Sequence, residues 1–282
     1  MNIHEQAQKA ERFRRLHQGC RILVLPNVWD VASARIVEEL GFPAIATSSA
    51  GIAASLGYAD GQRISRYEML DAVARIARAV QGPVTADMEA GYGTTLEDMA
   101  DTARMIVASG AVGFNLEDVT GSDESSHVDL PLQVEKIRTI REVCMSLGVP
   151  LVLNVRTDIY LMPIGEAASR FERTVERLRA YRKAGADCLF APGIQDGATI
   201  AKLVQALGAP LNVLVSSGTP PLAELEKMGV TRASVGSAVM RATLGLVRRI
   251  GKELLEKETY SSLFEGAVPY DEIQQMLQSE KN

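Results

Sequence analysis

The sequence has few cysteines and no long apolar run, and these absences exclude several classes of protein. Its 282 residues contain three cysteines, Cys20, Cys144 and Cys188, with no CxxC pair and no histidine at ligand spacing. An odd number of widely spaced thiols supports neither a disulfide framework nor a zinc site. No segment approaches the ~20 apolar residues of a membrane span, and residues 1–20 are too polar for the core of a signal peptide. We therefore expect a cytoplasmic protein with no membrane partner.

Positive charge is not in excess either. The net charge is −5 at pH 7, the pI is near 5.4, and the Lys and Arg residues are spread along the chain. Such a chain lacks the basic patch that attracts a polyanion, so nucleic acid is not an expected partner. Hydrophobic residues make up 46% of the chain and charged residues 23%, a balance typical of a globular protein with a large core.

Short apolar runs alternate with segments whose apolar residues have helical spacing. Eight runs rich in Val, Ile, Leu and Ala occur at 21–28, 44–49, 83–89, 113–118, 150–158, 187–192, 211–217 and 232–237. This alternation predicts parallel strands buried on both faces. Eight units favour a (β/α)8 barrel of the α/β class, with a doubly wound sheet as the alternative. We predict one domain over residues 1–282, with a polar helix at about 4–18 before the barrel and helical sequence after Gly245.

Charged side chains follow the ends of several predicted strands. In VTADMEAGYG, Asp87 and Glu89 are two residues apart, so a strand would point both in the same direction. Glu117 ends the next strand in NLED, and Arg156 and Asp158 end the fifth in NVRTD. Because the carboxyl ends of barrel strands form the functional mouth, we expect these groups to converge there.

A carboxylate cluster in a partly buried site needs compensation by protonation, hydrogen bonds or a cation. Oxygen ligands without a nearby His or Cys favour Mg²⁺ or Mn²⁺ over zinc. The alternative is that these acids cap helices or form ion pairs at strand ends. For Arg156, this alternative is an ion pair with Asp158 or Asp187.

Several segments together resemble one known family. TADMEAGYG resembles the metal-binding signature of the isocitrate lyase and phosphoenolpyruvate mutase superfamily, whose usual form is Asp-x-Asp-x-Gly-Tyr/Phe-Gly. The resemblance extends over essentially the whole chain, through SSAGIAASLGYAD, NLED, NVRTD, GADCLFAPG, LNVLVSSG and LEKMGVTRASVGSAVMRAT. Glu89 stands where the signature usually has Asp, which changes the reach of the carboxylate by ~1.5 Å.

The resemblance implies a metal site. Asp87 would ligate Mg²⁺, Glu89 and Glu117 would hold its waters, and Asp60 in LGYAD would be a further acidic partner. Mg²⁺ commonly keeps several waters between itself and protein carboxylates, which suits such an arrangement.

The resemblance also implies a substrate site. Ser48, Ser49 and Ala50 would surround the substrate carboxylate with backbone N–H groups and a hydroxyl, and Asn212 would add a neutral hydrogen bond. Arg156 would contact negative charge on the reacting group, because a guanidinium binds carboxylate or phosphonate through two hydrogen bonds and keeps its proton. Without the resemblance, Ser48 and Ser49 read equally well as strand-end residues that cap the next turn.

The loop EDVTGSDESSHVDLPLQ departs from the family. Isocitrate and methylisocitrate lyases resemble one another in a Lys-Lys/Arg-Cys-Gly-His loop, and no cysteine of this chain lies here. The Lys and Asn of the phosphonomutase loop, Glu-Asp-Lys-x-x-Pro-Lys-x-Asn, are also missing. His127 is the acid–base candidate that the loop offers, since its unperturbed pKa lies near neutrality, and a solvated histidine without a catalytic task is the alternative.

Three functions remain open. The first is a Mg²⁺-dependent lyase that acts through a 2-oxo-acid enolate, cleaving or decarboxylating a small 2-hydroxy or 2-oxo di- or tricarboxylate. The second keeps the same core for C–P chemistry, as a phosphoenolpyruvate mutase or phosphonopyruvate hydrolase. The third is a protein that binds a 2-oxo acid without turning it over, which the missing loop cysteine motivates.

The C-terminal segment YSSLFEGAVPYDEIQQML has apolar residues at helical spacing. It resembles the tail by which members of this family exchange a helix between subunits. The resemblance therefore implies a homodimer or homotetramer.

Overall fold

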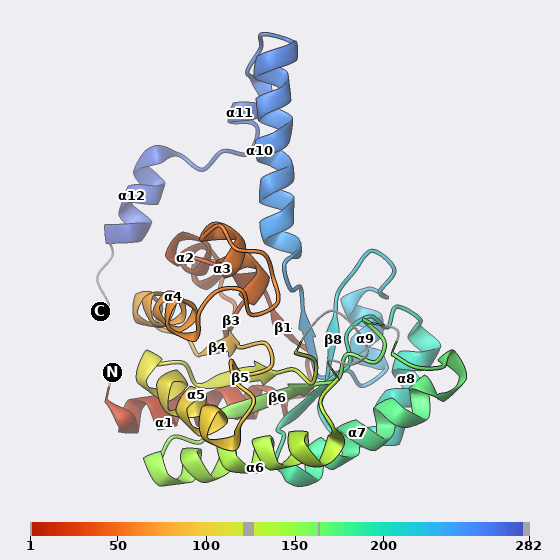
Figure 1. Ribbon diagram of the computed structural model, residues 1–282. Coiled ribbons are helices and arrows are strands. Elements are labelled where there is room, and N and C mark those ends of the chain that lie inside the picture. The colour runs from red at the N-terminus through yellow and green to blue at the C-terminus, as the bar shows by residue number, and fades with distance from the viewer. Residues whose placement is uncertain (1, 121–126, 163, 279–282) are drawn as a thin grey trace.

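The chain folds as a barrel of parallel strands with helices outside it, as the alternation predicts (Figure 1). The computed structural model describes residues 2–120, 127–162 and 164–278, so most of the polar loop expected to cover the site, residues 121–126, lies outside the described residues. The strands are β1 (Leu23–Leu25), β2 (Asn27–Val28), β3 (Ile45–Thr47), β4 (Val84–Asp87), β5 (Gly113–Leu116), β6 (Val152–Arg156), β7 (Cys188–Phe190), β8 (Leu211–Leu214) and β9 (Arg232–Ser234).

The nine strands correspond to the eight predicted ones because Pro26 divides the first into β1 and β2. A proline has no backbone N–H to donate to the ladder, so the strand assignment breaks there. β1 pairs with β9 and β2 with β3, and every other pairing joins neighbours in the order β9-β8-β7-β6-β5-β4-β3. All pairings are parallel, so the barrel closes through the divided strand and the doubly wound alternative does not hold.

Helices follow the strands and cover the outside of the barrel. They are α1 (Ile3–Leu16), α2 (Val31–Glu39), α3 (Ser49–Ser55), α4 (Arg66–Ala79), α5 (Leu96–Ser109), α6 (Leu130–Leu147), α7 (Arg170–Ala184), α8 (Gly197–Leu207), α9 (Leu222–Lys227), α10 (Ala238–Glu256), α11 (Ser261–Phe264) and α12 (Tyr270–Gln278), with a short 3₁₀ turn at Ala167–Ser169. Local sequence sets several boundaries: Ser65 and Thr95 begin α4 and α5 with capping boxes, and Gly110 ends α5 at a left-handed C-cap.

Helix α1 closes the amino-terminal end of the barrel. Phe13 and Ala10 on this helix are fully buried against Leu23 and Leu25 of β1 and neighbouring strand residues. Gly113 allows the close approach, since a Cβ there would lie 3.1 Å from the Phe13 ring and 2.5 Å from a backbone oxygen of β6. The functional side chains are therefore left at the opposite, carboxyl end.

The carboxyl-terminal helices form an arm that stands away from the barrel. Helix α10 already begins at Ala238 and passes through Gly245, earlier than predicted, and projects outward, while α12 packs beside α2 (Figure 1). Met240 is the buried side chain of α10, whereas Val247, Leu255 and Phe264 on the arm are exposed. Among the described residues, none of the helices has the length and apolar character that a bilayer crossing requires.

Candidate active site

A cavity of about 840 Å³ opens at the carboxyl ends of the strands. It brings together eight of the predicted site residues: Ser48, Ser49, Ala50, Asp60, Asp87, Glu89, Glu117 and Arg156. Asn212 and His127 are not among the residues that line it. Asn212 is fully buried and exchanges hydrogen bonds with Ser234, whose own side chain reaches the cavity.

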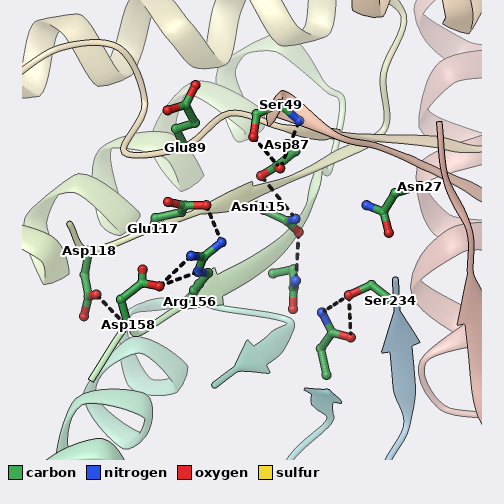
Figure 2. A network of polar contacts seen from close by, with 12 residues as sticks. Asn27, Ser49, Asp87, Glu89, Asn115, Glu117, Asp118, Arg156, Asp158 and Ser234 are labelled. Carbon is green, nitrogen blue, oxygen red and sulfur yellow. Dashed lines mark hydrogen bonds and ion pairs between the residues drawn. The ribbon is translucent and has the colours of Figure 1, made fainter. Parts of the chain in front are cut away.

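Asp87 is held at the end of β4 by hydrogen bonds from neighbouring strands. One carboxylate oxygen accepts from the backbone N–H and the hydroxyl of Ser49, at 3.1 and 2.7 Å. The other faces the amide nitrogen of Asn115 on β5 at 3.5 Å (Figure 2). These donors fix the carboxylate toward the cavity, where a charged ligand reaches it.

The serines after β3 divide their tasks. Ser48 is the N-cap of α3, and its hydroxyl accepts from the backbone N–H of Gly51 at 3.1 Å, which is the capping role that the sequence left open. Ser49 instead turns to Asp87. A ligand that occupies Ser49 therefore competes with Asp87 for the same donors.

Arg156 lies between two carboxylates (Figure 2). Its guanidinium donates to Glu117 at 2.5 Å and to Asp158 at 2.9 and 2.5 Å, and stacks over the Phe190 ring with 5.7 Å to the centroid. The ion pair with Asp158 is thus present, whereas Asp187 pairs with arginines on α1 and α6 instead. Burial alone would lower the pKa of Arg156, but Glu117 and Asp158 raise it above its usual value.

The acids around the cavity resist ionisation. Burial raises the pKa of Glu89 to about 7, and nearby Asp87 and Asp60 add to the rise. Burial likewise raises the pKa of Asp60, with the Asp87 charge contributing, and raises that of Glu117 although Arg156 opposes it. Acids outnumber arginines in the cavity lining, with Asp60, Asp87, Glu89, Glu117 and Asp158 against Arg63, Arg156 and Arg241. A bound cation would favour the ionised form of these acids.

These oxygens fit a hydrated hard cation. Within the described ranges, no three Asp, Glu, His or Cys side chains converge closely enough to coordinate an ion directly. Mg²⁺ suits such a site because it binds through one or two carboxylates and keeps several waters. Asp87, Glu117 and Asp60 all line the same cavity.

Glu89 does not follow the strand pattern that the sequence suggests. Strand β4 ends at Asp87, and Glu89 has a left-handed backbone with φ of 50°. The two residues are therefore not the i and i+2 positions of one strand, whose side chains would point in the same direction. Its oxygens instead accept from the backbone N–H of Gln62 and from the hydroxyl of Tyr92. Figure 2 shows Glu89 apart from the contacts that join Asp87, Asn115 and Arg156.

His127 is packed at the base of the loop rather than solvated. Its Nε2 lies 3.1 Å from the buried carboxylate of Asp118, and its side chain is 9% exposed. Asp118 also accepts from Arg177 at 2.8 Å and from Tyr181 at 2.6 Å. Asp118 thus anchors the loop, and these donors lower the pKa of its carboxyl despite burial.

The sequence analysis missed several polar residues of this site, among them Asn115, Asn27 and Arg241. Asn115 contacts Asp87, and it could have been found because it precedes Glu117 by two residues in the strand that the sequence predicts at 113–118. Asn27 accepts from the backbone N–H groups of Val235 and Gly236 and so joins the first strand to the last. Arg241 lines the mouth from the first turn of α10, a position that no local pattern marks.

Comparison with known proteins adds a family to this geometry. The phosphoenolpyruvate phosphomutase family matches residues 13–255. A 2-methylisocitrate lyase of Bacillus subtilis is 27% identical over 286 residues, covering 94% of this chain and 91% of that protein. A solved structure from Burkholderia cenocepacia is 38% identical with a TM-score of 0.90 and 98% coverage of both chains. The structure of an oxaloacetate acetylhydrolase with its product oxalate is 28% identical, with a TM-score of 0.84 and coverage of 95% and 93%.

Proposed function

Because the chain belongs to the phosphoenolpyruvate mutase family, we propose that it is a Mg²⁺-dependent lyase acting through the enolate of a small 2-oxo acid. The observation that carries the proposal is the cavity at the strand ends, which Asp87, Glu117 and Arg156 line together. Glu117 forms an ion pair with Arg156 there, and acidic side chains outnumber basic ones in the lining. Relatives named as 2-methylisocitrate lyase and oxaloacetate acetylhydrolase support a small carboxylate as the substrate.

In this proposal, Asp87 would bind the metal directly, and Glu117 and Asp60 would hold its waters. When bound, Mg²⁺ or Mn²⁺ neutralises the negative charge that develops on the substrate oxygens as the bond breaks. Ser49 and Asn115 keep the Asp87 carboxylate aimed at the cavity before the metal arrives.

The chain's own residues orient the substrate. Ala50 at the start of α3 would present its backbone N–H to the substrate carboxylate, and the backbone N–H of Ser49 would do so on leaving Asp87, while Ser48 keeps that turn in place through Gly51. Arg156 balances the charge of the reacting group and, because a guanidinium does not lose its proton, it acts without transferring one. Asn212 does not line the cavity and would act indirectly, through its hydrogen bond to Ser234, which does.

His127 is the proposed acid–base group. Its Nε2 faces Asp118, outside the cavity lining, so direct proton transfer to substrate requires the ring to leave that contact. A His127→Gln variant that loses only the proton-transfer step, while still binding substrate, supports this role. A variant with unchanged turnover removes it.

A turnover screen tests the lyase proposal. The protein with Mg²⁺ is offered oxaloacetate, methylisocitrate, dimethylmalate and phosphonopyruvate, and products are followed by mass spectrometry, with Asp87→Ala as the control. We expect a pyruvate, glyoxylate or oxalate product that disappears in the variant. Equal turnover by Asp87→Ala overturns the placement of the site.

Two alternatives keep the same site. C–P chemistry is favoured by the family match itself, and phosphorus NMR of phosphonopyruvate with Mg²⁺ checks it, since an unchanged spectrum after long incubation rules it out. Binding without turnover is favoured by Arg156, which already has two carboxylate partners. Any product formed faster than by Asp87→Ala excludes that alternative.

We also propose that the arm assembles the protein into a homodimer or homotetramer. Leu255, which is 84% exposed, and Phe264, which is 69% exposed, leave apolar surface on α10 and α11 that a second copy would cover through an exchanged helix. Light scattering after chromatography tests this assembly. A monomeric mass for the unmodified chain, unaltered in Leu255→Asp, would contradict it.

A further inference from the structure

Backbone strain in this protein is concentrated beside the cavity. Among the described residues, four non-glycine residues have left-handed backbones: Gln62 with φ of 57°, Glu89 with 50°, Tyr92 with 59° and Glu258 with 54°. The first three lie in two loops, after α3 and after β4, whereas Glu258 lies in the C-terminal arm. Residues other than glycine avoid this region, so such strain persists only where surrounding contacts impose it.

The three strained residues near the cavity are bonded to one another. The backbone N–H of Gln62 donates to one oxygen of Glu89 at 2.5 Å, and the hydroxyl of Tyr92 donates to the other at 2.8 Å. The backbone N–H of Tyr92 donates to the side-chain oxygen of Gln62 at 2.8 Å. Each residue therefore contacts the other two, and both Glu89 oxygens are engaged. We call Gln62, Glu89 and Tyr92 the Glu89 latch.

The latch joins a cavity wall to the strand that carries Asp87. Residues 60–63 line the cavity consecutively, and Gln62 is the member of this wall that the latch holds. Tyr92 is fixed in turn, because the neighbouring Gly91 packs against Met99 so closely that a Cβ would lie 2.6 Å from its sulfur. The α3–α4 loop is thus tied to a rigid part of the barrel through one carboxylate.

We propose that Glu89 is a positioning residue, which holds the 60–63 wall and so places Asp60 and Arg63 over the site, instead of facing the metal. The part of this inference that concerns metal binding rests on the proposed function. The latch depends on the length of the Glu89 side chain. Asp at this position would shorten the reach of the carboxylate by ~1.5 Å and lose the hydrogen bonds to Gln62 and Tyr92. The two oxygens of Glu89 bind the neighbouring loop residues Gln62 and Tyr92, whereas Ser49 and Asn115 hold the Asp87 carboxylate at the end of β4.

Two variants of Glu89 separate the latch from a metal-facing role. Glu89→Gln keeps the length and can still accept from Gln62 and pair with Tyr92, but it removes the charge. Glu89→Asp keeps the charge and breaks the latch. A metal-facing carboxylate and a latch therefore predict opposite orders of damage for the same two substitutions.

The first measurement is the opening of the wall. Hydrogen exchange of peptides over 57–64 and tryptic cleavage after Arg63 report it without any turnover, because the next residue, Ile64, is 1% exposed and must open for cleavage. We expect both rates to rise about tenfold in Glu89→Asp and to stay near those of the unmodified protein in Glu89→Gln. Tyr92→Phe, which removes one hydrogen bond, serves as a milder second variant with an intermediate rise.

The second measurement is metal binding, followed by Mn²⁺ electron paramagnetic resonance. We expect Mn²⁺ affinity to fall about threefold in Glu89→Asp, because Asp60 loses its position, and to change less in Glu89→Gln.

Glu258→Gly, which relieves the strained residue of the arm, is the matched control and should alter neither readout. Weaker binding in Glu89→Gln than in Glu89→Asp overturns the proposal, as does unchanged exchange over 57–64 in both Glu89→Asp and Tyr92→Phe. Failure of the proposed lyase function is distinguishable, since it would appear only in the turnover screen.

Discussion

Two arginines lie inside the barrel, Arg156 partly buried and Arg232 fully buried, and their surroundings are opposite. Arg156 near the mouth contacts the carboxylates of Glu117 and Asp158. Arg232 on β9 is fully buried, has no salt bridge among the described residues, and its Nε and Nη1 atoms have no hydrogen-bond partner there. Burial lowers the pKa of Arg232 to about 10, because no contacting carboxylate offsets the lost hydration as it does for Arg156.

The comparison shows that Arg156 compensates the charge of the carboxylates it contacts, whereas Arg232 orients polar side chains in the barrel interior. Arg232 reaches across the barrel, and its Nη2 donates to the side-chain oxygen of Asn115 at 3.3 Å. Asn154 donates to the same oxygen at 2.7 Å. Since a guanidinium can only donate, the Asn115 oxygen must face Arg232 and its nitrogen must face Asp87. Arg232 therefore fixes the orientation of the Asn115 side-chain amide, which contacts Asp87.

The largest effect is expected from Arg156→Met. It leaves Glu117 and Asp158 buried without their cation, so we expect the free energy of unfolding to fall by about 3 kcal/mol and kcat/KM to fall about a thousandfold. Urea unfolding and the turnover screen measure the two. Adding Glu117→Gln should restore part of the stability and none of the activity. A single variant as stable as the unmodified protein would break the contrast.

Arg232→Met should have a smaller effect on stability. It removes a buried charge that has no ion-pair partner and fills the space with a side chain of similar length, so the free energy of unfolding should change by at most about 1 kcal/mol. Mn²⁺ affinity should rise about threefold, because a positive charge coupled to Asp87 is lost. Destabilisation equal to that of Arg156→Met would show that the two arginines are equivalent after all.

The smallest effect concerns His17, on the closed end of the barrel. Burial lowers the pKa of His17 to about 4, and the charge of Arg232 contributes. Below its usual pKa of about 6.5, the unfolded chain takes up a proton that the folded protein refuses, so stability is lost as pH falls from there toward 4. In Arg232→Met, the pKa should rise only partway, because burial is the larger cause. Proton NMR of the ring resolves it, and an unchanged titration would contradict the coupling.

Much of this arrangement could be predicted because it depends on period and position. Alternating strands and helices gave the barrel, and the ends of those strands gave Asp87, Glu117 and Arg156 a common cavity. Glu89 escaped the same reasoning because β4 stops before it and a left-handed backbone turns its carboxylate to another loop. Arg232 was missed because nothing in RASVGS tells that a strand residue will cross the barrel to Asn115. Contacts between distant strands depend on the closed fold.

Helix α1 closes one end of the barrel, and this determines how substrate and products pass in and out. Phe13 blocks the amino-terminal end, so substrate enters and both fragments of a cleavage depart through the same mouth. In the proposed lyase, a product that still occupies the site at Asp87 and Arg156 would therefore compete with incoming substrate for that opening.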